Sequence, residues 1–193
     1  MKNIVALVLA LLVCLSLKTI VEAQTLHELC QTSSFGKIKD AIKKGANVNE
    51  LNIDKKTPLM FACANNATTE VVLLLLSSGA NVNLADKDGK TALIYASESN
   101  RYETVINDLI KAGAKINAKT KEGKTALMYA CEKNPNIKIV VQLVNSGADV
   151  NEKSNDGTTP LMYAKKNKSG GLITVILVQA GANSHIPLDM DMQ

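Results

Sequence analysis

The chain has 193 residues, with 22 lysine and arginine residues against 18 aspartate and glutamate residues, which gives a formal net charge of +4. Its basic pairs, such as Lys43-Lys44 and Lys165-Lys166, are separated by acids and form no clustered run. A charge this small and this dispersed predicts a solvated surface and no nucleic acid partner.

The first 23 residues are typical of an export signal. Lys2 precedes an apolar-to-small run over residues 4–17, which is shorter than the ~20 residues that span a bilayer. Val21 and Ala23 place small side chains where a signal peptidase needs them. We therefore expect residues 1–23 to be removed as a signal peptide, without stable membrane insertion afterwards. An uncleaved amino-terminal anchor is the alternative.

The chain that remains after removal of the leader carries a small positive charge. Removing Lys2, Lys18 and Glu22 leaves 20 basic and 17 acidic side chains, a net charge of +3. We expect a periplasmic or secreted protein. The short leader and a composition rich in lysine, asparagine and isoleucine favour a bacterial source.

Two motifs recur through the rest of the chain with a period of 34 residues. Gly-Ala-x-x-Asn begins at Gly45, Gly79, Gly113 and Gly147, with a worn copy at Gly181. Thr-(Pro/Ala)-Leu-(Met/Ile)-(Phe/Tyr)-Ala begins at Thr57, Thr91, Thr125 and Thr159. A fixed period of this size is typical of a solenoid, in which each unit buries its apolar face only against its neighbours.

Each unit predicts two helices and a turn. The threonine starts a short first helix by accepting hydrogen bonds from free amides, and Pro58 fits the first turn that follows Thr57. In the third unit, Val105, Ile106 and Leu109 form the apolar stripe of a second helix. Gly113 ends that helix, because glycine readily adopts the left-handed conformation of a helix carboxyl end.

An extended segment and a polar turn connect each unit to the next. Gly89, Gly123 and Gly157 occupy one position of this turn. Lys55 stands there between the first two units, so we expect that turn to be strained or differently shaped.

These residues resemble ankyrin repeats. The segments 57–62 and 159–164 are similar to the family's Thr-Pro-Leu-His-x-Ala signature, and 147–151 is similar to its turn-and-hairpin sequence. The resemblance implies an all-α repeat fold, an ankyrin solenoid of about five helix-turn-helix units with β-hairpin-like turns. The domain would cover 24–187, with units at about 24–56, 57–90, 91–124, 125–158 and 159–187, and 188–193 would form a short tail.

Two features depart from the family pattern. The period is 34 residues where the family usually has 33, and the extra residue falls between the paired helices. The signature histidine is replaced by apolar residues in four units and survives only as His27. We expect apolar packing in place of a buried hydrogen bond, at little loss of fold specificity.

Cys30, Cys63 and Cys131 fall at one repeat position. Equivalent atoms in adjacent helical units lie on the order of 8–10 Å apart, whereas a disulfide needs α-carbons within roughly 7 Å. We therefore expect buried thiols without disulfides. Because the number of thiols is odd and the protein is expected to be exported, a reactive free thiol is the alternative. The spacing predicts no metal site, and nothing in the sequence predicts a cofactor.

The sequence predicts no catalytic residues and no enzyme. His27 occupies the signature position and His185 stands at a hairpin position, so both have structural explanations. Asp88, Glu122 and Asp156 recur at one turn position, but in separate units they form a ridge and no close acid/base pair.

Four of the six aromatic residues stand at one repeat position in the first helices: Phe61, Tyr95, Tyr129 and Tyr163. We expect them to point off the buried stripe into the groove that the first helices line, where tyrosine is a favoured interface residue. The alternative is that the rings only pack on one another between units. One helical turn further, Asn65, Ser99, Lys133 and Asn167 would share the same face.

The resemblance adds the hairpin tips as contact points. These are Ile53, Asp54 and Lys56; Lys87, Asp88 and Lys90; Lys121, Glu122 and Lys124; and Asn155, Asp156 and Thr158. Because ankyrin repeats bind proteins through the concave groove and these tips, we expect a monomeric, non-enzymatic module that binds a protein partner, which the sequence does not identify. We further expect Tyr95→Ala with Tyr129→Ala to weaken binding while the fold survives.

Three other roles remain open from the sequence. The chain could be an accessory or protective factor for a specific exported enzyme, or a secreted effector that acts on a host protein. It could also be a thiol-based or small-ligand sensor, in which case the three cysteines would react in the folded state.

Overall fold

The computed structural model describes residues 25–32, 35–65, 68–99, 101–167 and 170–183. The expected signal peptide over 1–23, His185 and the tail at 188–193 lie outside these residues. Within them, the helices and turns of five successive units can be followed.

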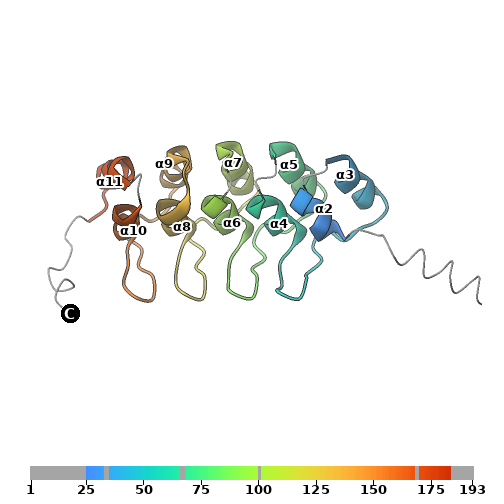
Figure 1. Cartoon of the computed structure of the whole chain (residues 1–193), viewed down its shortest axis with the longest axis horizontal. Coiled ribbons are helices and arrows are strands. Elements are labelled where there is room, and N and C mark those ends of the chain that lie inside the picture. The colour runs from blue at the N-terminus through green and yellow to red at the C-terminus, as the bar shows by residue number, and fades with distance from the viewer. Residues whose placement is uncertain (1–24, 33–34, 66–67, 100, 168–169, 184–193) are drawn as a thin grey trace, which may run out of the picture.

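The described residues form ten helices in two layers (Figure 1). The first helices of the units are α2 (Leu26–Thr32), α4 (Pro58–Ala64), α6 (Ala92–Ser99), α8 (Ala126–Lys133) and α10 (Pro160–Lys166). The second helices are α3 (Phe35–Lys43), α5 (Thr69–Ser77), α7 (Glu103–Lys111), α9 (Ile137–Asn145) and α11 (Gly170–Gln179). Long loops project from the layer of first helices, all on one side (Figure 1). The predicted helical solenoid is confirmed.

The threonines start the first helices as expected, with one exception. The Thr57 hydroxyl accepts a hydrogen bond from the Met60 amide at 3.2 Å, and Thr159 caps α10 in the same way. These bonds satisfy amides that have no partner inside the helix. The hydroxyl of Thr125 is buried and has no hydrogen-bond partner among the described residues, so α8 starts without this cap.

One apolar core runs the length of the stack, from Leu26 in the first unit to Ala182 in the last. In α7 the stripe predicted from the sequence is fully buried, with Val105, Ile106 and Leu109 all 0% exposed. Each first helix packs on the first helices of the adjacent units and on its own second helix. The core is therefore continuous between units, as a solenoid requires.

The asparagine that closes each Gly-Ala-x-x-Asn motif bridges to the next unit. The Asn83 side-chain amide donates to the Gly113 carbonyl at 2.9 Å, and its oxygen accepts from the Lys115 amide at 2.9 Å. Asn49, Asn117 and Asn151 make the same pair of bonds. One side chain thus satisfies a donor and an acceptor of the following helix end, which explains its place in the repeat.

The loops that follow are hairpin-like but contain no regular strand in the described residues, where only an isolated bridge joins Ala85 and Thr91. Successive loop tips are linked by main-chain hydrogen bonds. The Lys87 amide donates to the Asp54 carbonyl and the Lys121 amide to the Asp88 carbonyl, both at 2.9 Å. The third such link, at 3.0 Å, joins the last two hairpins. The tips therefore form one connected row.

Lys55 adopts the conformation that glycine has in the other hairpins. Its φ is 59°, where Gly89 has 81°, Gly123 has 76° and Gly157 has 80°. The turn therefore keeps the same left-handed backbone and is not differently shaped, so the strain stays a prediction. A left-handed conformation costs a residue with a β-carbon about 1–2 kcal/mol, and glycine avoids this cost.

We predict that Lys55→Gly raises the free energy of unfolding by about 0.5–1 kcal/mol, because relief of the left-handed strain exceeds the extra chain entropy of glycine. The midpoint of urea denaturation measures this. The matched control is Gly157→Lys, where an added β-carbon meets no atom within 4 Å but φ is 80°, so a loss of stability is expected. Equal midpoints for Lys55→Gly and the parent would contradict the prediction that the backbone at residue 55 is strained.

Candidate functional site

The candidate site is the inner face of the stack, by which we mean the surface formed by α2, α4, α6, α8, α10 and the hairpins. The predicted aromatic row lies here but is largely covered. Tyr95, Tyr129 and Tyr163 are 9%, 4% and 5% exposed, and Phe61 is half-buried. The expectation that these tyrosines offer an open aromatic strip is wrong, because other side chains lie over their rings.

Those side chains are lysines from the hairpins. The Lys90 ammonium lies 5.3 Å from the ring centroid of Tyr95 and 4.5 Å from that of Tyr129. Lys124 bridges Tyr129 and Tyr163 in the same way, at 5.5 and 4.8 Å. A cation held over an aromatic face contributes about 0.5–1 kcal/mol at exposed sites and more when desolvated.

The lysines and rings alternate along the inner face, and we call this row the ring–lysine ladder. Its members in order are Phe61, Lys56, Tyr95, Lys90, Tyr129, Lys124 and Tyr163. Lys90 and Lys124 were expected to extend from the hairpin tips, and that expectation is also wrong. Their side chains are only 20% and 19% exposed, since they turn back onto the rings.

Two glutamates pair with two of the three lysines of the ladder, Lys90 and Lys124. Glu98 accepts from Lys90 at 2.7 Å and from Lys133 at 2.6 Å, and Glu132 lies 3.4 Å from Lys124. Burial alone raises the pKa of Glu98, but the hydrogen bonds from Lys133 and Lys90 outweigh it and hold the pKa below its usual value. The carboxylate therefore stays ionised and fixes both cations.

A further hydrogen bond ties the ladder to the second hairpin. The Tyr95 hydroxyl donates to Asp86 at 2.6 Å, and the other oxygen of Asp86 accepts the amides of Asp88 and Lys90. Burial, followed by this contact with Asp86, raises the pKa of Tyr95 far above its usual value. Tyr95 is consequently a neutral structural donor that orders the hairpin carrying Lys90.

The second expected row on this face is only partly available. Asn65, Ser99 and Asn167 each donate a side-chain hydrogen bond to a main-chain carbonyl. Lys133 is 49% exposed and reaches Glu98, so it forms the open end of the charged cluster. Asn65, the first residue of the row in chain order, is also exposed.

Ile53 and six further predicted tip residues are exposed along the row of hairpins, whereas Asp54 and Thr158 are partly buried. The six are Lys87, Asp88, Lys121, Glu122, Asn155 and Asp156. Neighbouring hairpins exchange side-chain contacts, since Lys87 pairs with Asp54 at 2.7 Å and the Asn155 amide donates to the Lys121 carbonyl at 2.8 Å. Hydrogen bonds from Ser154 and Thr158 lower the pKa of Asp156 to about 2. These residues form a polar ridge beside the ladder.

Sequence reasoning missed the acids of this face. Glu98, Glu132 and Asp86 were not among the predicted site residues. One signal does mark the glutamates: Lys90 and Lys124 are each followed eight residues later by glutamate, in phase with the repeat. The contact itself depends on how the hairpin folds back over the first helix.

The three cysteines and His27 are buried side chains whose surroundings indicate a structural role. Cys30, Cys63 and Cys131 are buried and form no disulfide in the part of the chain that is described. Burial raises the pKa of Cys30 and of Cys131 to about 12, and that of Cys63 further. Nε2 of His27 lies 2.9 Å from the Glu50 carbonyl, which joins α2 to the first hairpin. No group of metal ligands occurs among the described residues.

Comparison with known families agrees with this geometry. The family model described as ankyrin repeats (3 copies) matches residues 26–120 and 104–186. The chain belongs to the ankyrin repeat family. Such repeats generally mediate interactions between proteins and are typically not enzymes.

A search of curated proteins found no match. Over the described residues, none of the helices has the length and apolar character needed to cross a membrane.

We predict that Glu98→Gln lowers the free energy of unfolding at pH 7 by about 1 kcal/mol, because a neutral amide holds Lys90 and Lys133 less well. The pKa of Glu98 is depressed in the folded state, so its stabilisation is present above the unfolded pKa and is lost as pH falls through the folded value. The denaturation midpoints of the two proteins should therefore begin to converge as pH falls below the ordinary glutamate pKa of about 4.3, and should meet only below the lower folded pKa.

The control for this prediction is Glu103→Gln, whose partner Lys138 lies 3.5 Å away in an exposed pair. It should change the midpoint little at any pH. A gap between Glu98→Gln and the parent that is as wide at pH 3 as at pH 7 would show that the carboxylate charge is not the source.

We predict that Cys30, Cys63 and Cys131 resist iodoacetamide at pH 8 in the folded protein, since raised pKa values and burial leave almost no accessible thiolate. Peptide mapping by mass spectrometry measures modification at each position, with the urea-unfolded chain as the fully reactive control. Rapid modification of any of the three in the folded state would instead support a thiol-based sensor.

Proposed function

We propose that this ankyrin repeat protein recognises a protein partner through its inner face and the tips of its hairpins, and that it is not an enzyme. The observation that carries this proposal is the connected row of hairpin tips. Main-chain bonds join the tips, and the row presents both charges and one apolar side chain, Ile53, which is 97% exposed. Leu51, two residues earlier, is 48% exposed, so this part of the chain offers two exposed apolar side chains that a partner could cover.

The tips are rigid because of what lies behind them. The buried Asp86 organises the second hairpin from within, and the ring–lysine ladder holds its base against the first helices. A surface that is ordered before contact loses little conformational entropy on binding. The alternating charges of the ridge, such as Lys121 and Glu122, would orient the partner.

The tyrosines support this surface from below and do not supply its contacts. Replacing Tyr95 by alanine would remove a buried ring and leave Asp86 without its 2.6 Å partner. Such losses commonly cost a few kcal/mol, so the double tyrosine variant is expected to affect folding. Exposed residues are therefore the better probes of binding.

The setting of this function is also part of the proposal. We propose that the protein is exported, on the strength of the leader-like residues 1–23, and that it acts in a periplasm or outside the cell. A monomer is also part of the proposal. Roles as an accessory factor for an exported enzyme or as a secreted effector are both forms of protein binding. The buried cysteines favour either of them over the thiol sensor.

We predict that Ile53→Ser weakens binding of the natural partner by about 5–30-fold, the loss expected for an apolar contact residue at an interface. The partner would be identified by affinity capture from source cells, and the dissociation constants would then be measured by calorimetry. Because Ile53 is 97% exposed, the thermal midpoint should not change.

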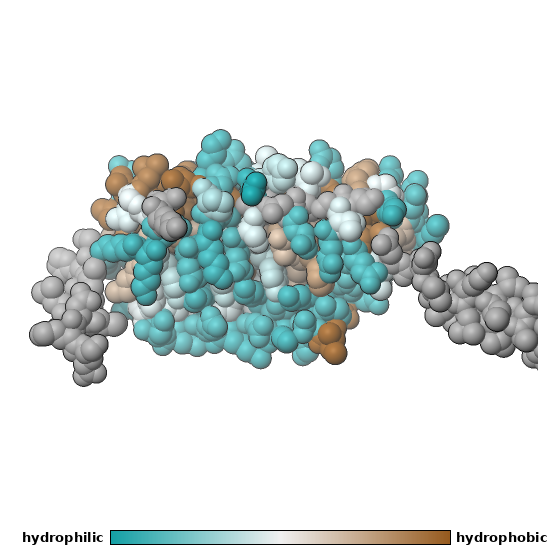
Figure 2. Space-filling model, viewed as in Figure 1, coloured by the Kyte–Doolittle hydropathy of each residue, from teal (hydrophilic) through white to brown (hydrophobic). Residues whose placement is uncertain are grey.

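The matched control is Leu172→Ser on α11, in the outer layer of helices. Leu172 is 57% exposed and, with Val175 and Val178, is one of three exposed apolar residues of α11. Figure 2 shows an apolar area at the α11 end of the stack. This control loses a similar apolar group from the other side of the molecule and should leave binding intact. A partner retained equally by both variants would place the interface elsewhere, while loss with Leu172→Ser alone would assign it to the outer helices.

A further inference from the structure

The ring–lysine ladder has one lysine without its carboxylate. Lys56, Lys90 and Lys124 occupy the same repeat position and each lies over two aromatic rings. The residue eight positions later is glutamate for Lys90 and Lys124, namely Glu98 and Glu132. For Lys56 it is Ala64.

No other described acid replaces the missing glutamate. Asp54 lies in the same hairpin, but its carboxylate bonds to Lys87 at 2.7 Å. Among the described residues Lys56 forms no ion pair within 4 Å, while its ammonium lies 5.1 Å from the Tyr95 centroid and 5.9 Å from that of Phe61. The cation is thus held in place with no carboxylate in contact, and Asp54 acts on it only at longer range.

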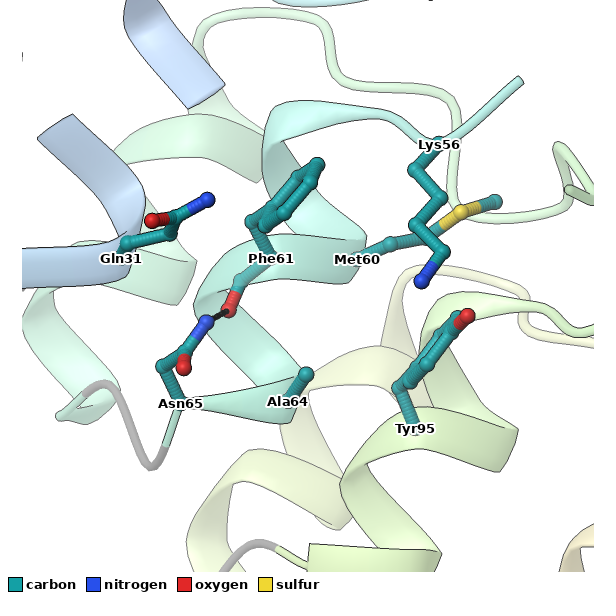
Figure 3. A pocket seen from close by; sticks show the side chains of 7 residues that line it. All are labelled: Gln31, Lys56, Met60, Phe61, Ala64, Asn65 and Tyr95. Carbon is teal, nitrogen blue, oxygen red and sulfur yellow. Dashed lines mark hydrogen bonds between the residues drawn. The ribbon is translucent and has the colours of Figure 1, made fainter. Parts of the chain in front are cut away.

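The place of the missing carboxylate is a pocket of about 240 Å³ (Figure 3). Its lining residues are Gln31, Lys56, Met60, Phe61, Ala64, Asn65 and Tyr95. In Figure 3 the Lys56 side chain reaches from the hairpin toward the Tyr95 ring, above Ala64. Apolar side chains therefore form much of the wall, and a single ammonium supplies the charge.

We propose that this pocket takes an acidic side chain, glutamate or aspartate, of the partner protein. The occupant would supply to Lys56 what Glu98 supplies to Lys90 at 2.7 Å within the chain. Its methylene groups would contact Phe61 and Ala64. This inference rests on the proposed function, and it defines the chemistry of one contact within that interface.

The dimensions favour a side chain over a free small molecule. Pockets for drug-sized ligands usually measure about 300–1,000 Å³ and enclose most of the ligand, whereas this one is smaller. An ammonium already fixed between two rings gives a carboxylate a charge-assisted hydrogen bond with little further ordering. The same pocket lies next to the hairpin that carries Ile53, so one partner segment could contact both.

The experiment is a selection of binders from a display library of random dodecapeptides on the immobilised full chain. Four versions are compared: the parent, Lys56→Met, Ala64→Glu and Ala64→Gln. Ala64→Glu restores the internal carboxylate and should occupy the pocket, whereas Ala64→Gln is matched in size but carries no charge. We expect peptides from the parent and from Ala64→Gln to share one acidic position, and those from Lys56→Met and Ala64→Glu to lack it.

Calorimetry on the strongest parent binder completes the test. Changing its shared glutamate to glutamine should weaken binding to the parent about tenfold and leave binding to Ala64→Glu unchanged. Denaturation midpoints of the four proteins show whether each variant is folded. Ala64→Glu should be at least as stable as Ala64→Gln, because it gains the Lys56 ion pair.

Several results would overturn the inference. One is a selection on the parent that yields no binders, or that yields binders with no acidic position in common. Another is an acidic preference that survives in folded Ala64→Glu, and a third is acetate or glutarate binding at Lys56 as tightly as the peptide. These outcomes are independent of the proposed function, which depends on the natural partner's response to Ile53→Ser.

Discussion

The two-ended hydrogen bond of the motif asparagine is the interaction on which the stack depends. Apolar packing brings the helices of adjacent units together, but it has no direction and permits sliding. Asn83 and its equivalents fix the spacing, because each bonds to the glycine carbonyl and to a main-chain amide of the next unit. The hairpins consequently follow one another in register, and their tips meet closely enough for main-chain bonds.

That register also produces the ring–lysine ladder. A lysine from one hairpin can lie over the rings of two units only if those units are held at constant spacing, as Lys90 is over Tyr95 and Tyr129. Glu98 then pairs with two cations from different elements, Lys90 in a hairpin and Lys133 on α8, both within 2.7 Å. Most charged side chains of the inner face therefore pair with one another and stabilise the stack. Only a charged side chain without such a pair is available to a partner.

The sequence predicted the helices, their starts and the solenoid because these depend on local chemistry repeated in phase. Thr57 and Gly113 act within a few residues of their own position. The burial of Tyr95 could not be predicted in this way, since it depends on lysines from two hairpins folding back over one helix. The same holds for Lys90 and Lys124, which are tip residues by sequence and inner-face residues in space.

The departures from the period show where specificity can reside. Most repeat positions satisfy one another from unit to unit and would look alike to any partner. Three departures fall within twelve residues of sequence: Ile53 where others are polar, Lys55 where others are glycine, and Ala64 where two units have glutamate. The first leaves an apolar side chain exposed, the second adopts a left-handed backbone, and the third leaves Lys56 without a carboxylate in contact. None of them improves the stack, so a contact made outside it is the simplest physical reason for all three to stand together.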